Sequence, residues 1–293
     1  MRNILITILF VSQLSIVGSA IGRTLIIGHI SDTPGETIKI INPFAEYLAT
    51  QLGNVGIDKC KVLVVDTIPE MANKMRNQEI DMYIDSPFPV TAVSRLAEST
   101  IVLRRWKKGM AEYSSKIVVA IDSPLQSIMD LQGKMIAFED PASTSGYFLP
   151  KAALLAAGLK PKEHNDKTVK VSGDEVGFTF SLHKNNTLLW VARGLVAAGA
   201  IGTHEFQEFE AKNPKTLRVI HETQSVPRNV VSFRKGLEEN LGKRIREVLL
   251  AMETSEQGQS VLKYYEKTVR FDEIPGGTIE AMAPFQQLTA DMQ

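Results

Sequence analysis

The sequence predicts an α/β protein built from two lobes that two crossing segments join. Strand-like apolar runs alternate with helix-like stretches, a pattern typical of βαβ units and parallel sheets. A second alternating series starts at Lys116, although nothing in it repeats the first half residue by residue. About 270 residues follow the N-terminal segment, which is enough for two domains.

Residues 1–22 are predicted to form a cleavable secretory signal peptide. Arg2 precedes a mostly apolar run from Ile4 to Val17, and the small residues Gly18, Ser19 and Ala20 follow it. The run is short and interrupted for a membrane span. We therefore expect a soluble mature protein in the periplasm, with a retained signal anchor as the alternative.

The charge balance excludes nucleic acid as an expected partner. The chain has 33 basic and 33 acidic residues, so it lacks the positive field that binding to phosphodiester backbones requires. Its single cysteine, Cys60, rules out an internal disulfide, which is compatible with a periplasmic domain large enough to build its own core. Because Cys60 precedes a strand-like run, we interpret it as a strand-edge residue rather than a reactive thiol.

The first half of the chain shows four strand-like runs and an amphipathic helix. The spacing of Phe44, Tyr47, Leu48 and Leu52 places apolar side chains on one helical face, and Gly53 suits the end of that helix. The expected elements are a strand at 24–28, a helix at 43–53, a strand at 61–65, a helix at 67–75 and strands at 80–84 and 101–106.

The second half continues the alternation and ends in helices. The expected elements are strands at 116–121, 134–138, 168–171, 200–201, 217–220 and 226–233 and helices at 125–131, 151–158, 188–198, 237–252 and 257–265. The helix-rich tail indicates that the chain returns to the first domain. We therefore predict a discontinuous lobe 1 (23–115 plus 225–293), a lobe 2 (116–224), and hinge crossings near 113–116 and 221–227.

The stretch from Glu139 to Pro150 is the best candidate for a ligand-holding loop. It follows the strand at 134–138 and leads into an alanine-rich helix, and it carries three hydroxyl residues and a glycine, which are Ser143, Thr144, Ser145 and Gly146. Side-chain hydroxyls and unpaired backbone N–H groups can converge there, and the glycine lets a ligand approach the backbone. Such a point suits an anion, although an ordinary helix cap is the alternative interpretation.

Two further segments are candidates for the walls of a ligand pocket. Ser86 and Phe88 lie in a proline-rich turn after the strand at 80–84, and ligands of open α/β sheets lie beyond the carboxyl ends of strands. The strand at 101–106 ends in a cluster of cations, of which Arg104 or Arg105 is expected to supply the counter-charge for an oxyanion.

Four motifs together resemble a known family, the phosphate, phosphite and phosphonate binding proteins of ABC transporters. They are Glu-Tyr-Ser-Ser at 112–115, Asp-Leu-Gln-Gly-Lys at 130–134, Glu-Asp-Pro-Ala-Ser-Thr-Ser-Gly-Tyr at 139–147 and Glu-Gln-Gly-Gln-Ser-Val-Leu at 256–262. The resemblance covers nearly the whole mature chain, and its most specific element is the Ser-Thr-Ser-Gly loop.

The resemblance implies a type II periplasmic binding protein that closes its two lobes around a small oxyanion for an ABC transporter permease. Ser143, Thr144 and Ser145 would grip the oxyanion, and Ser86, Phe88 and Tyr113 would face them from the first lobe. Aminophosphonate binders of the family tend to carry an acidic residue in a motif where this chain has Ala197. The resemblance therefore favours a compact oxyanion without an amine.

Two other functions stay open at this stage. A periplasmic sensor for phosphate-like or arsenic oxyanions, signalling to a histidine kinase, would use the same fold and loop. An enzyme with Ser143 or Ser145 as nucleophile and His183 as its base lacks a Gly-x-Ser-x-Gly elbow and an identifiable acid partner. We expect a monomeric binding protein that is not an enzyme and needs no cofactor or metal.

Overall fold

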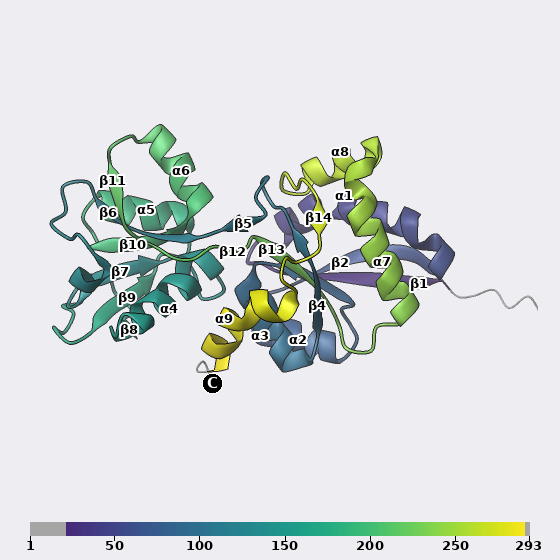
Figure 1. Cartoon of the computed structure of the whole chain (residues 1–293), viewed down its shortest axis with the longest axis horizontal. Helices are drawn as coiled ribbons and strands as arrows, with labels where there is room; N and C mark the ends of the chain where they lie inside the picture. Colours follow the sequence, from purple (N-terminus) through teal and green to yellow (C-terminus); the bar gives the residue numbers. More distant parts are fainter. Residues whose placement is uncertain (1–21, 291–293) are drawn as a thin grey trace, which may run out of the picture.

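The structure is a computed structural model that describes residues 22–290, and it consists of two α/β lobes side by side (Figure 1). The first lobe is built on a six-stranded sheet in the order β14-β4-β13-β3-β1-β2. Its strands are β1 (Arg23–Ile30), β2 (Ile57–Val65), β3 (Met82–Asp85), β4 (Thr100–Arg105), β13 (Asn229–Phe233) and β14 (Phe271–Asp272). Strand β1 runs parallel to β2 and β3, whereas β13 is antiparallel to both β3 and β4.

Helices cover both faces of this first sheet, because successive side chains of a strand point to opposite faces. On β3, Met82 and Ile84 join one hydrophobic core and Tyr83 joins the other. The helices are α1 (Pro34–Leu52), α2 (Ile68–Arg76), α3 (Pro87–Ala97), α7 (Glu239–Ala251), α8 (Glu256–Tyr264) and α9 (Thr278–Ala290), with 3₁₀ turns at Gly53–Val55 and Met252–Thr254. The first core packs against α1, α7 and α8, and the second against α2, α3 and α9.

The second lobe has its own six-stranded sheet, in the order β11-β6-β10-β7-β9-β8. Its strands are β6 (Ser115–Ala120), β7 (Met135–Phe138), β8 (Pro161–Glu163), β9 (Val176–Phe180), β10 (Ala198–Gly202) and β11 (Leu217–Glu222). Its helices are α4 (Leu149–Ala156), α5 (Lys184–Ala192) and α6 (Thr203–Lys212), with a 3₁₀ turn at Ile128–Leu131 and a π-helical turn at Thr144–Phe148. Strand β7 lies inside the sheet, between β10 and β9.

Two short strands connect the lobes. Strand β5 (Glu112–Tyr113) pairs antiparallel with β12 (Val226–Pro227), and each lies next to a point where the chain passes from one sheet to the other (Figure 1). The predicted α/β fold of two lobes joined by two strands is therefore confirmed. The exact lobe boundaries and the hinge motion stay predictions.

Some predicted elements of the second lobe are wrong. The predicted helix at 125–131 is a single 3₁₀ turn, and 168–171 is not a strand because no neighbouring strand pairs with it. The strand instead is β9, whose Val-Gly-Phe-Thr-Phe sequence is almost entirely buried. The predicted helix at 188–198 stops at Ala192, and Gly194 then adopts a φ of 66°, which favours glycine.

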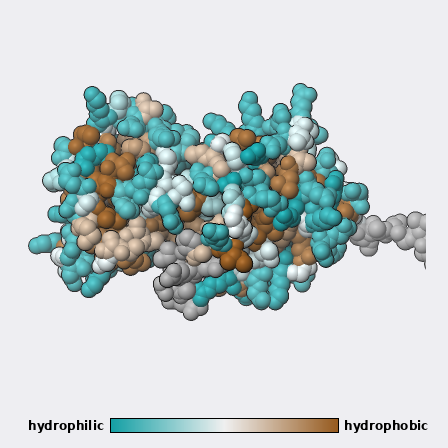
Figure 2. All heavy atoms as spheres, viewed as in Figure 1, coloured by the Kyte–Doolittle hydropathy of each residue, from teal (hydrophilic) through white to brown (hydrophobic). Residues whose placement is uncertain are grey.

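The predicted signal peptide, apart from its last residue, lies outside the described residues. Within 22–290, no helix combines the length and the apolar character that crossing a membrane requires. The face shown in Figure 2 is mainly hydrophilic, with hydrophobic side chains in separate patches over both lobes.

Candidate functional site

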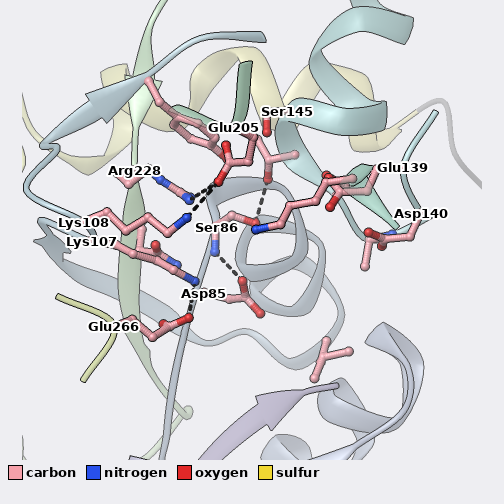
Figure 3. A pocket seen from close by; sticks show the side chains of 17 residues that line it. Asp85, Ser86, Lys107, Lys108, Glu139, Asp140, Ser145, Glu205, Arg228 and Glu266 are labelled. Carbon is pink, nitrogen blue, oxygen red and sulfur yellow. Dashed lines mark hydrogen bonds and ion pairs between the residues drawn. The ribbon is translucent and has the colours of Figure 1, made fainter. Parts of the chain in front are cut away.

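A cavity of about 350 Å³ lies between the two lobes and the strands that connect them (Figure 3). Residues of the first lobe and of the connecting segments that line it are Ile30, Asp85, Ser86, Lys107, Lys108, Tyr113, Arg228, Asn229 and Glu266. Residues of the second lobe that line it are Glu139, Asp140, Ala142, Ser143, Thr144, Ser145, Lys184 and Glu205. The cavity thus lies beyond the carboxyl ends of β3 and β7, where open α/β sheets bind ligands.

The loop after β7 reaches the cavity because it folds back on its own strand end. The Glu139 N–H donates to the carbonyl oxygen of Gly146 at 2.9 Å, and the Ser143 hydroxyl accepts the Gly146 N–H at 2.9 Å. A Cβ on Gly146 would lie 2.4 Å from the Glu139 Cβ, so this close approach requires glycine. Gly146 therefore shapes the loop but does not itself line the cavity.

The three hydroxyls of the loop have different partners. Ser143 donates to a Glu139 carboxylate oxygen at 2.9 Å, and Thr144 donates to the Ser86 hydroxyl at 2.9 Å. The Ser145 carbonyl accepts from the Ser115 hydroxyl at 2.6 Å, whereas no hydrogen bond to the Ser145 hydroxyl is found among the described residues. Ser145 therefore has a hydroxyl proton available for a ligand, and Ser86 keeps its own because Thr144 acts as donor toward it.

The predicted proline-rich turn at 86–88 is the start of helix α3. Pro87 occupies the first helical position, where its missing N–H costs nothing, and Ser86 precedes it without capping the helix through its side chain. Phe88 does not line the cavity; its ring stacks on Phe148 of the second lobe with centroids 4.2 Å apart. Of the two residues predicted here, Ser86 lines the cavity and Phe88 joins the contact between the lobes.

Tyr113 and Arg228 form the floor of the cavity on the connecting segments. The Arg228 guanidinium lies 4.4 Å from the centre of the Tyr113 ring, and burial raises the pKa of Tyr113 to about 12. The Arg228 Nε and the Asn229 Oδ1 are buried without a hydrogen-bond partner among the described residues. Both atoms are enclosed by protein rather than open to the cavity, so they do not by themselves indicate a ligand.

The prediction that Arg104 supplies the counter-charge is wrong in the geometry of the structure. Arg104 grips Asp272 through two nitrogens, at 2.9 and 2.7 Å, and Glu112 through a third at 3.0 Å, and it does not line the cavity. Arg105 is fully buried and lies over the Tyr265 ring. The cations that do line the cavity are Lys107, Lys108, Lys184 and Arg228.

Most of these cations are already paired with carboxylates. Lys107 contacts Glu266 at 2.6 Å, and Lys108 contacts Glu205 at 3.2 Å from across the cleft, where Arg228 also approaches Glu205 at 3.8 Å (Figure 3). Burial opposes ionisation of Glu205, yet Arg228 and Lys108 hold the pKa of Glu205 below its ordinary value. Glu266 and Glu205 therefore fix the positions of the cations on this side of the cavity.

Acidic residues line the opposite wall of the cavity, and Ala197 is not among its lining residues. Ala197 lies in a different, surface groove of the second lobe, whereas Glu139 and Asp140 line the cavity facing the cations (Figure 3). Burial, followed by the charge of Asp140, raises the pKa of Glu139, and burial also raises the pKa of Asp140. The preference for a compact oxyanion without an amine therefore stays a prediction.

His183 does not support a catalytic function. Its Nδ1 accepts the Asn185 N–H at 3.2 Å, so the side chain caps helix α5, and it does not line the cavity. Within residues 22–290, no histidine lines the cavity with the serine hydroxyls of the loop.

Sequence reasoning missed Arg228 and Asn229, although a signal was available. Both residues lie where the second predicted crossing, near 221–227, enters β13. Because crossing segments form the floor between two lobes, polar side chains in them are candidates for ligand contacts. Lys107 and Lys108 belong to the cation cluster after the predicted strand at 101–106. Which cations of this cluster face the cleft depends on how β4 pairs with its neighbouring strands, and the sequence does not show that pairing.

The comparisons with known proteins agree with this architecture. The family model of the periplasmic substrate-binding proteins of phosphonate ABC transporters matches residues 27–275. A Xanthomonas citri protein, XAC2383, solved with a chloride ion, is similar at 24% identity with a TM-score of 0.84, covering 91% of this chain and 96% of that one.

Two further solved structures share the fold. PhnD1 from Prochlorococcus marinus, in complex with methylphosphonate, is 19% identical with a TM-score of 0.69, covering 92% of this chain and 98% of that one. The aliphatic sulphonate binding protein SsuA from Escherichia coli is 21% identical with a TM-score of 0.53, covering 90% of this chain and 78% of that one. At these identities the likeness establishes the fold, that of a type II periplasmic binding protein.

Proposed function

This chain belongs to the family of periplasmic substrate-binding proteins of phosphonate ABC transporters, and we propose that it captures a small oxyanion of the phosphonate, phosphite or phosphate type between its lobes. One observation carries the proposal. The Ser-Thr-Ser loop, with the Ser145 hydroxyl, and the connecting segments, with the cation Arg228, line the same cavity between the lobes.

The available donors suit a tetrahedral oxyanion. Ser145 and Ser86 offer hydroxyl protons from opposite lobes, and Arg228 lines the cavity with a guanidinium whose Nη2 lies 3.8 Å from Glu205, beyond hydrogen-bond distance. Each hydrogen bond to a charged oxygen contributes about 1.5 to 3 kcal/mol, so a few of them support micromolar affinity after the cost of association. Because the donors come from both lobes, the ligand would stabilise the closed arrangement.

Delivery to an ABC permease in the periplasm follows from the family membership. The family match favours transport over signalling to a histidine kinase, and the genes that flank this one would discriminate between the two. The methylphosphonate held by PhnD1 makes that compound a sensible first probe for this chain. We also propose that the protein works as a monomer.

Ser145→Ala tests the assigned site. A thermal-shift screen of methylphosphonate, phosphite, phosphate and sulfate first identifies a ligand, since a ligand that binds only the native state raises the melting temperature. Titration calorimetry is then expected to show at least several-fold weaker binding for Ser145→Ala, because a charge-assisted hydrogen bond is lost.

The matched control is Ser260→Ala, which removes an exposed serine hydroxyl from α8 outside the cavity. It should leave the affinity unchanged. Equal affinities of Ser145→Ala and the wild type for the ligand identified would show that the site has been assigned to the wrong residues.

A further inference from the structure

Glu139 occupies the hydroxyl proton of Ser143, so this hydroxyl cannot donate to a ligand. Its carboxylate accepts the only proton of the Ser143 hydroxyl at 2.9 Å, while the same hydroxyl oxygen accepts the Gly146 N–H at 2.9 Å. A serine hydroxyl has one proton to donate. As long as Glu139 is an ionised acceptor, Ser143 therefore has no proton for an oxyanion, although both residues line the cavity.

The surroundings of Glu139 are predominantly negative. Asp140 on its own loop and Glu205 at the start of α6 face it, and Lys184 at the start of α5 is the cation nearby. Asp140 in turn faces Asp85 of the first lobe, and also Asp32 after β1. Within residues 22–290, neither Glu139 nor Asp140 forms an ion pair. Burial and neighbouring charge accordingly raise the pKa of Glu139.

An oxyanion at the Ser143 hydroxyl would lie close to this carboxylate. Two successive hydrogen bonds through one hydroxyl place the outer oxygen atoms within about 6 Å of each other. Like charges at that separation in a closed, partly dry cleft repel strongly. The charged carboxylate thus opposes the ligand in two ways, by repulsion and by occupying the proton that Ser143 would donate.

We propose, building on the proposed function, that Glu139 couples capture of the oxyanion to the uptake of one proton. In the closed complex Glu139 is a neutral carboxylic acid, and the Ser143 hydroxyl turns to donate to the ligand. The proton comes from solvent, and no covalent bond other than the new O–H changes. Glu139 thereby determines specificity: in its neutral form the site can hold a negatively charged ligand, whereas the ionised form would repel it.

Glu139 rather than Asp140 takes the proton because their hydrogen bonds differ. Asp140 accepts the Ala142 N–H at 2.8 Å, a backbone bond that favours its charged form and cannot rotate away. The side chain of Glu139 hydrogen-bonds, among the described residues, only to the Ser143 hydroxyl, which can turn toward another acceptor. Protonating Glu139 therefore costs the loop no backbone hydrogen bond.

Calorimetry in paired buffers of different ionisation enthalpy measures the proton directly. The full mature chain is titrated with methylphosphonate, phosphite and phosphate between pH 5 and 8, and the proton change of each ligand alone is subtracted. We expect a net uptake approaching one proton. Because the complex holds more protons than the free protein, affinity falls as pH rises, by up to tenfold per unit between the free and bound pKa values of Glu139.

Glu139→Gln is expected to abolish the proton uptake and to make the affinity independent of pH once the ligand's own titration is subtracted. The glutamine carbonyl still accepts from Ser143, and its amide can donate to the ligand without carrying charge. The matched variant Glu163→Gln, at an exposed acid on the edge strand β8, should retain the uptake.

The outcomes separate this inference from the function on which it rests. Binding without proton uptake, or proton uptake that persists in Glu139→Gln, would overturn the role of Glu139 and leave the oxyanion site standing. The role is overturned too if 2-aminoethylphosphonate binds without uptake and Glu139→Gln loses only that ligand, since Glu139 then holds an ammonium group. If none of the oxyanions binds the wild type, the proposed function fails first.

Discussion

At the scale of single residues, the position of a cation in the fold decides whether it can bind a ligand. Arg104 satisfies three of its guanidinium nitrogens with Asp272 and Glu112, so binding an anion would require breaking those bonds. Arg228 instead lines the cavity, 4.4 Å from the centre of the Tyr113 ring, and its contact with Glu205 at 3.8 Å is beyond hydrogen-bond distance. Only the second arrangement leaves donor capacity for a ligand.

Arg228→Lys tests this distinction because it keeps the charge. Lysine lacks the planar guanidinium that lies over the Tyr113 ring and the fork of N–H donors that can bind two oxygen atoms at once, so we expect at least about tenfold weaker oxyanion binding by calorimetry. Arg193→Lys, at an exposed arginine after α5, is the matched control and should bind like the wild type. If the two variants bind equally well, a point charge at 228 is sufficient and the guanidinium has no special role.

At the scale of elements, helix α3 is capped by the opposite lobe. Ser86 occupies the N-cap position but makes no capping hydrogen bond with its side chain. The Phe88 N–H instead donates to the Thr144 hydroxyl oxygen at 3.0 Å, and Thr144 is almost completely buried. A free N–H at a helix start requires an acceptor, so the second lobe supplies what the first lobe lacks.

Thr144→Val removes the acceptor while nearly preserving the shape. It leaves the buried Phe88 N–H unpaired and deletes the donor to Ser86, so we expect the free energy of unfolding to fall by about 1 to 3 kcal/mol. Urea denaturation and ligand calorimetry together measure the loss of stability and of affinity. Thr144→Ser keeps the hydroxyl and serves as the control; a valine variant no less stable than the serine variant would refute capping between lobes.

At the scale of the whole molecule, an aromatic stack joins the two lobes beside the cavity. Phe148 of the second lobe stacks on Phe88 with centroids 4.2 Å apart and on Phe285 of α9 with centroids 5.5 Å apart. Phe148 and Leu149 belong to a hydrophobic core that otherwise consists of residues from the first lobe and the connecting strands. The lobes therefore share apolar surface that would be exposed to water if they separated.

Phe148→Ala is expected to shift the protein without ligand toward a more open form. The substitution removes the ring between two others, so small-angle scattering should give a larger radius of gyration for the folded protein than for the wild type. Phe178→Ala is the matched control, because Phe178 is equally buried but contacts only rings of the second lobe. It should lower stability by about 3 to 5 kcal/mol without changing the radius of the folded state. An unchanged radius for Phe148→Ala would contradict the prediction.

The loop of the candidate site could be predicted from the sequence, whereas the cations that line the cavity could not. The loop at Ser143–Gly146 lies where a strand gives way to a helix and carries its own donors, so its position followed from local pattern. The register of β4 could not be predicted, because β14 places Asp272 opposite Arg104 from 168 residues away. Local sequence contains no signal for such a pairing, and the choice among the clustered cations therefore failed.

The two-lobed α/β architecture, the position of the loop at 143–146 and the resemblance to the family could be predicted from the sequence, because alternation, turn residues and a contiguous motif act over short stretches of chain. Which charges meet in the cleft depends on the tertiary structure. Arg228, Glu205 and Glu139 come from three separate segments, and their distances depend on how the sheets and connecting strands bring those segments together. Electrostatic interactions depend on distance in space rather than along the chain, so the charge balance of the cleft became visible only in the folded molecule.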